Sequence, residues 1–161
     1  MKITTKTRYG IRAILEIARE TNNNGIYQKE ISRRQDLSLK YLDQIILALK
    51  TANLIMNVKG KKSGYILTKP ANEISILELF NALEAETYVV DCIAPSYVCK
   101  KESYCTMKQF WLGLDKIITN YFRSYTLQDL LEKQINIETL VNIQPDGSSC
   151  SETTPQKNRQ T

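Results

Sequence analysis

Three of the four cysteines in this 161-residue chain lie close together in one short stretch, DCIAPSYVCKKESYC. These are Cys92, Cys99 and Cys105, on a segment with neither helical nor strand-like periodicity. Thiolates are soft metal ligands and good nucleophiles. The group could therefore bind a metal, form a disulfide or respond to oxidants.

The spacing of these cysteines, Cys-x6-Cys-x5-Cys, fits some of these three possibilities better than others. Zinc sites pair cysteines about two to four residues apart and need four ligands, so zinc fits poorly. Disulfides are rare in the cytosol. A thiol redox switch remains, and so does an iron–sulfur cluster, because three thiolates on one loop can wrap a cluster from several sides. Incidental loop cysteines are the other interpretation that the spacing leaves open.

The composition argues against an enzyme. The chain has no histidine, which excludes Ser/His/Asp and Cys/His catalysis and any histidine-ligated metal site. No nucleophile with a partner or acid/base pair is evident. There is no run of about eighteen apolar residues, and the N-terminus lacks the apolar region of a signal peptide. We therefore expect a cytoplasmic protein without a membrane span.

Charge is distributed unevenly along the chain. Residues 1–70 contain 14 Lys and Arg against 5 Asp and Glu, whereas residues 71–161 contain 8 against 12. The basic half is where an anionic polymer such as double-stranded DNA would bind.

The basic half has the order of elements of a winged helix. Apolar residues at helical spacing predict helices over 6–20, 28–35 and 39–53. Two β-rich runs, Leu54–Val58 and Tyr65–Thr68, flank a Lys/Gly/Ser turn and predict a hairpin. The predicted fold is mainly α, with a winged helix-turn-helix DNA-binding domain in residues 1–70.

The second helix of such a motif enters the major groove with its N-terminal residues. The candidate base-reading residues are Ser38, Lys40, Asp43 and Gln44. Lys suits guanine, Gln suits adenine and Asp accepts from cytosine, while Ser38 is also placed to cap the helix. The candidate phosphate contacts are Arg33, Arg34, Lys59, Lys61 and Lys62. The alternative is a solvated basic face that makes protein contacts.

The second half differs in character. Helices are predicted over 75–85, 106–125 and 126–133. The middle helix has more apolar surface than one small domain needs. Residues 136–161 are polar and are predicted to form a disordered tail.

The chain resembles the IscR-type branch of the Rrf2 regulators from its start to about residue 133. The matching stretches are TTKTRYGIRAI, DLSLKYLDQII, VKGKKSGYILT and the three cysteines followed by TMKQFW. The resemblance implies a homodimeric winged-helix transcription factor that binds a palindromic operator. It also implies an iron–sulfur cluster on the three cysteines, usually 2Fe–2S but 4Fe–4S in nitric-oxide-sensing relatives. The long helix over 106–125 would cross its dimer mate, which accounts for its apolar surface and assigns residues 71–135 to the cluster-binding loop and dimerisation helices.

One departure from the family concerns the fourth cluster ligand. Where cluster-biogenesis regulators have a histidine this chain has Lys108, and a protonated amine has no lone pair to offer. The nitric-oxide branch can use an aspartate near the start of the first helix, where Arg8 stands here. The fourth ligand is therefore open between Asp91, Glu102, Cys150 and a solvent molecule or small thiol.

The expected function is that of a DNA-binding repressor that senses iron–sulfur cluster status through Cys92, Cys99 and Cys105, with genes of cluster biogenesis as its targets. A 2Fe–2S cluster is preferred to 4Fe–4S. One alternative is a nitric-oxide or redox sensor with a 4Fe–4S cluster. Another is a cluster carrier or interaction protein whose winged helix does not bind DNA.

Overall fold

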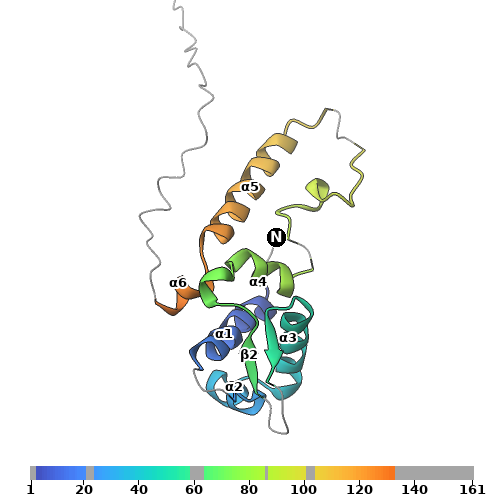
Figure 1. Cartoon of the computed structure of the whole chain (residues 1–161). Helices are drawn as coiled ribbons and strands as arrows, with labels where there is room; N and C mark the ends of the chain where they lie inside the picture. The colour runs from blue at the N-terminus through green and yellow to red at the C-terminus, as the bar shows by residue number, and fades with distance from the viewer. Residues whose placement is uncertain (1–2, 21–23, 59–63, 86, 101–103, 133–161) are drawn as a thin grey trace, which may run out of the picture.

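The computed structural model describes residues 3–20, 24–58, 64–85, 87–100 and 104–132. Within them a compact head holds the first four helices and the hairpin, and a long helix projects from it beside the cysteine segment (Figure 1). The elements are α1 Thr5–Arg19, α2 Gln28–Gln35, α3 Leu39–Thr51, β1 Ile55–Asn57, β2 Tyr65–Leu67, η1 Ala71–Glu73, α4 Ile76–Leu83, η2 Asp91–Ile93, α5 Lys108–Ser124 and α6 Leu127–Leu131. The predicted mainly helical fold with a small antiparallel hairpin is confirmed.

One hydrophobic core holds the head together. Helices α1 to α3 contribute its central side chains, among them Ile14, Leu42 and Ile45, each fully buried. The core also takes in Leu79 of α4 and Leu127 of α6, both fully buried. Each such side chain contributes about 1.5–3 kcal/mol of hydrophobic stabilisation. The core therefore includes residues from both sides of residue 70, while the predicted division into domains stays a prediction.

Side-chain caps define where several helices begin. Ser38 caps α3 as predicted, with its hydroxyl accepting from the Tyr41 backbone N–H at 3.2 Å. Thr126 and Asp129 form a capping box at the start of α6. These caps satisfy backbone N–H groups that have no partner within the helix.

The turn between α2 and α3 depends on a left-handed residue. Asp36 ends α2 with φ 52° and ψ 50°, a conformation that Asp tolerates better than most residues. The next residue, Leu37, is buried, and its N–H donates to the Ser32 carbonyl at 3.0 Å. The Ser32 hydroxyl donates back to the Leu37 carbonyl. This arrangement sets the angle at which α3 leaves α2.

The hairpin is attached to the chain just before α2. Ile26 and Tyr65 form an antiparallel bridge through two backbone hydrogen bonds, 3.1 and 2.8 Å long. Beside it, Gly25 has φ +63°, and a Cβ there would lie 2.6 Å from the Tyr65 carbonyl oxygen. Glycine is therefore required at residue 25 for both conformation and space.

We expect Gly25→Ala to lower the free energy of unfolding by about 2 kcal/mol or more, because the left-handed conformation and the overpacking each cost about 1–2 kcal/mol. Urea denaturation measures this loss. Gly113→Ala is the matched control: nothing lies within 4 Å of a Cβ there, and alanine favours the helix. A Gly25→Ala variant as stable as the wild type would contradict the packing described here.

Candidate DNA-reading face and cysteine segment

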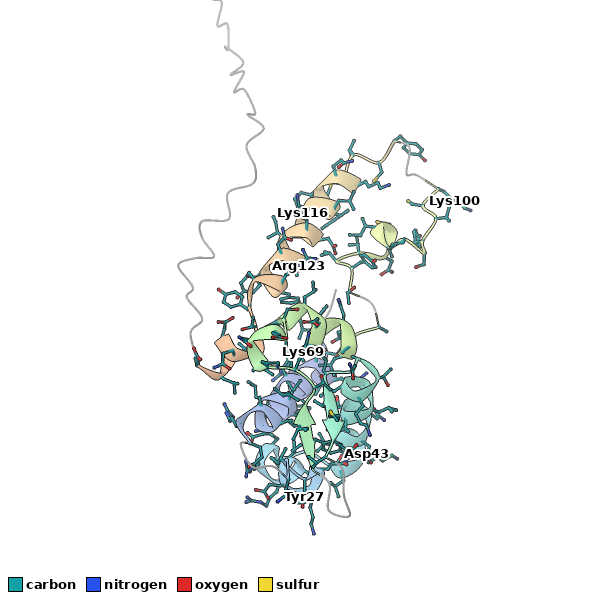
Figure 2. All side chains as sticks on the ribbon, viewed as in Figure 1. Tyr27, Asp43, Lys69, Lys100, Lys116 and Arg123 are labelled. Carbon is teal, nitrogen blue, oxygen red and sulfur yellow. The ribbon has the colours of Figure 1, made fainter. Side chains whose placement is uncertain are left out.

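The predicted base-reading residues lie at the start of α3, with Ser38 as its N-cap and the others in its first half. Ser38, Lys40, Asp43 and Gln44 are all exposed. Asp43 lies at the end of the head that is farthest from α5 (Figure 2). The predicted phosphate contacts Lys59, Lys61 and Lys62 lie outside the described residues.

Two neighbouring residues on this face have different surroundings. Asp43 accepts a hydrogen bond from Gln28 Nε2 at 2.5 Å. Gln44 instead lines an open groove of about 550 Å³ whose far side is formed by Asn81 and Ala82 of α4. Periodicity placed both residues on the outer face, but it could not show that Gln28 contacts one of them. That contact joins different helices and has no signal in the sequence.

Arg33 and Arg34 are both bound to carboxylates of the chain itself. Arg33 makes two hydrogen bonds to Glu30, of 2.7 and 3.0 Å, although its side chain is 73% exposed. Arg34 donates to Glu30 at 2.8 Å and to the buried Glu16 of α1 at 3.2 Å. The guanidiniums of Arg33 and Arg34 lower the pKa of Glu30 to about 2. Arg34 thus also ties α2 to α1.

The three cysteines lie on the segment between α4 and α5. Cys92 is in the short turn η2, and Cys99 and Cys105 lie on the loop that follows. All three are free thiols and partly exposed. In the part of the chain that the structure describes, no three Cys, Asp or Glu side chains come close enough together to hold a metal ion.

The donor chemistry of the segment fits an iron–sulfur cluster, since it offers three thiols that no disulfide occupies. Asp91 is exposed beside Cys92 and lines a pocket of about 290 Å³ with Tyr88 and Tyr97. The Lys108 backbone N–H donates to the Cys105 carbonyl at 3.4 Å. Two other candidate fourth ligands, Glu102 and Cys150, lie outside the described residues. The fourth ligand stays open.

Hydrogen bonds fix the part of the segment that precedes the cysteines. Glu84 follows α4 and accepts from the Thr4 N–H at 2.9 Å and the Thr4 hydroxyl at 2.7 Å. Five residues later, the Val89 N–H donates to Asp115 of α5 at 3.0 Å. The Thr7 hydroxyl also donates to Glu84. The segment is thereby connected to the start of α1 and to α5.

The ionisation of Glu84 favours this connection. Burial raises the pKa of the carboxyl, but hydrogen bonds from Thr7 and Thr4 and the charge of Lys6 outweigh burial and lower the pKa below its ordinary value. The carboxylate is therefore the form that holds α1 against the end of α4.

Helix α5 has no buried residue in this chain. Phe110 is 58% exposed and Ile117 is 43% exposed, and Leu112 is also exposed. Helix α4 contacts α5 toward its C-terminal end, where Phe80 packs against Phe122, and the three side chains named above are open to solvent. No helix in the described part of the chain is long and apolar enough to cross a membrane.

A helix-turn-helix with a hairpin wing and an exposed α3 defines a winged-helix transcriptional regulator. The family model Rrf2, described as an iron-dependent transcriptional regulator, matches residues 3–133. The chain belongs to the Rrf2 family, as its sequence motifs indicated, and its relatives are transcriptional regulators rather than enzymes.

Individual relatives agree with this assignment over most of their length. Protein rrf2 of Nitratidesulfovibrio vulgaris is 31% identical, covering 92% of this chain and 99% of the relative. The HTH-type transcriptional regulator IscR of Photorhabdus laumondii is 31% identical, covering 83% of this chain and 81% of the relative. The solved structure of T. potens IscR is similar with a TM-score of 0.66 and 29% identity, covering 84% of this chain and 89% of that one.

We expect Glu84→Gln to lower the free energy of unfolding near neutral pH by about 1–2 kcal/mol, because charge-assisted hydrogen bonds to two threonines become neutral ones. The folded-state pKa is lowered, so the carboxylate stabilises the fold above its unfolded pKa of about 4.3 and loses this effect as the pH falls through the folded value. The difference between wild type and variant should therefore shrink below about pH 4.

Urea denaturation midpoints at neutral and acidic pH measure this effect. The exposed Glu73 serves as the control, and Glu73→Gln should leave the midpoint nearly unchanged at both pH values. A constant difference between wild type and Glu84→Gln across the pH range would show that the charge on Glu84 is not what matters.

Proposed function

We propose that this Rrf2-family regulator is a homodimeric repressor whose affinity for a palindromic operator is set by an iron–sulfur cluster on Cys92, Cys99 and Cys105. The observation that carries the proposal is the presence of three free thiols on one segment that connects the DNA-reading head to α5. The IscR relatives support a role in iron–sulfur regulation. Genes for cluster assembly are the targets we propose.

The proposed contact with DNA places the first half of α3 in the major groove. Lys40 would contact guanine, Gln44 adenine, and Asp43 the amino group of cytosine. Ser38 completes the base-reading residues, and phosphate contacts are assigned to Arg33, Arg34, Lys59, Lys61 and Lys62. The basic charge of residues 1–70 supports this arrangement, because it supplies the affinity that does not depend on sequence.

The proposed dimer uses α5. Its exposed apolar side chains, Phe110, Leu112 and Ile117, have no partner in the described part of the chain that would remove them from water. Packing them against a second α5 would bury this surface at roughly 25 cal/mol per Å². A two-fold dimer then presents two copies of α3 to two half-sites of a palindrome.

The cysteines would hold the cluster as thiolates, and the bound cluster would supply sensitivity to oxidants and to iron supply. The three thiols are not gathered in this structure, so ligating one cluster with all three requires the segment to change shape. On the side that precedes Cys92, Glu84 holds the segment to α1 and Asp115 holds it to α5. A change in the shape of the segment would therefore displace α4, which is part of the head, and α5, which makes the proposed dimer contact.

Cys99→Ala should abolish cluster binding and leave the fold intact, because Cys99 lies on a surface loop outside the core. Absorbance with iron and sulfide counting after anaerobic purification measures the cluster, and circular dichroism measures the fold. Ser96→Ala, at an exposed residue of the same loop, is the matched control and should retain full iron content. A count of two irons per chain fits 2Fe–2S, whereas four irons favours the nitric-oxide or redox-sensing alternative. Wild-type protein without iron would remove the support for a cluster.

Gln44→Ala should relax preference at one base position in each half-site. A bidentate amide–adenine pair discriminates by about 1–3 kcal/mol against a wrong base. Non-specific affinity should hardly change, because no charge is lost. Binding to a panel of single-base operator variants measures this preference. An equal loss of affinity for every operator variant would instead indicate that Gln44 supports α3 beside the groove that it shares with Asn81 and Ala82.

A further inference from the structure

We propose that Gln28 is a specificity-positioning residue: its side-chain amide fixes the Asp43 carboxylate on the reading face of α3 and connects it to the wing through Tyr65. The inference deepens the proposed function and rests on it, because it requires Asp43 to read a base.

The hydrogen bonds of Gln28 use both ends of its amide. Nε2 donates to Asp43 Oδ1 at 2.5 Å and reaches the Leu39 carbonyl at 3.4 Å. Oε1 accepts from the Tyr65 hydroxyl at 3.4 Å. These partners also determine which way the amide points. A flipped amide would set its oxygen against the carboxylate and its N–H₂ group against the hydroxyl.

Three elements meet at this residue. Gln28 is the first residue of α2, Asp43 lies on α3, and Tyr65 begins β2 of the wing. Tyr65 is itself held by its two backbone hydrogen bonds to Ile26, two residues before Gln28. The Gln28 amide therefore links the reading helix to the strand that carries the wing. The wing and α3 are the two parts of a winged helix that contact DNA.

Fixing Asp43 matters because a carboxylate on a DNA-reading face is a selective but costly group. It can accept from the amino group of cytosine, yet elsewhere it is repelled by phosphates. Gln28 occupies one lone pair of Oδ1, and the remaining lone pairs of the two oxygens can still accept from a base. A side chain that is already ordered also loses less entropy when DNA binds. Discrimination at the base read by Asp43 should therefore depend on Gln28.

This role can be separated from a structural one. The Gln28–Asp43 contact lies on the surface, and neither residue belongs to the hydrophobic core. Replacing the amide with a group of similar length should therefore leave the fold as stable as before. A residue that only supported the fold would change stability and would weaken binding to all sequences alike.

The test uses full-length protein and an operator selected by the wild type from a pool of random duplexes. Gln28→Met keeps the length of the side chain and removes its hydrogen bonds. We expect discrimination at the base pair read by Asp43 to fall by about 3- to 20-fold, a loss within the range for coupled neighbouring residues. Affinity for unrelated DNA and the midpoint of urea denaturation should be unchanged. In Asp43→Ala, adding Gln28→Met should cause no further loss.

Two further variants sharpen the result. Tyr65→Phe removes the hydroxyl that orients the Gln28 amide, so it should cause a smaller loss at the same base pair. Gln35→Met is the matched control at the other end of α2, where the amide bonds to Arg12 and Glu16 instead of α3. It should leave discrimination at that base pair as it is in the wild type.

The proposal is overturned if Gln28→Met keeps full discrimination, or if it weakens binding to every sequence equally. It is also overturned if the losses from Gln28→Met and Asp43→Ala add. Failure of the proposed function looks different. Either the wild type would enrich no sequence from the pool, or Asp43→Ala would keep the discrimination of the wild type at every position, and the role of Gln28 would then fall with it.

Discussion

The contact of α4 with α1 is the constraint on which the remaining architecture depends. At Gly10 a Cβ atom would lie 2.5 Å from Leu83 Cδ1, so the side chain of α4 packs directly against the backbone of α1. Thr7, one turn earlier, is buried and donates to Glu84. Every element after α4 therefore starts from a point fixed to the first helix of the head. A larger residue at Gly10 would move that starting point rather than one local side chain.

This constraint also relates the cysteine segment to α3. Helix α4 packs against α3 as well as α1, and its Asn81 lines the groove that Gln44 borders. The connection between the cysteine segment and α4 is short, because the segment begins immediately after Glu84. A displacement of α4 by a fraction of an ångström would reach both α3 and the start of α1, since packed helices transmit strain. The fold thus offers a direct mechanical connection between the cysteines and α3 that needs no rearrangement of the core.

Much of this architecture could be predicted from the sequence. The parts that could not be predicted share a physical cause. The helices, the hairpin and the cap by Ser38 depend on local periodicity and turn chemistry, and all were predicted within a few residues. The partners of Asp43, Arg34 and Glu84 could not be predicted, because each contact joins residues far apart in the chain. The three cysteines were evident from their types and spacing. Their separation in the folded chain is a property of loop geometry that spacing does not encode.

The acidic partner of Arg33 and Arg34 has a consequence for how the regulator searches a chromosome. Two of the five N–H groups of Arg33 donate to Glu30, a carboxylate that stays ionised throughout the physiological pH range, so a phosphate that contacts Arg33 would meet a negative charge beside it. Part of the attraction of Arg33 to any stretch of DNA would thus be offset by Glu30. The offset would apply at every site, but base contacts would compensate for it only at the operator. In the proposed complex, Glu30 would therefore shorten the time spent on irrelevant DNA and leave the regulator free to sample more of it.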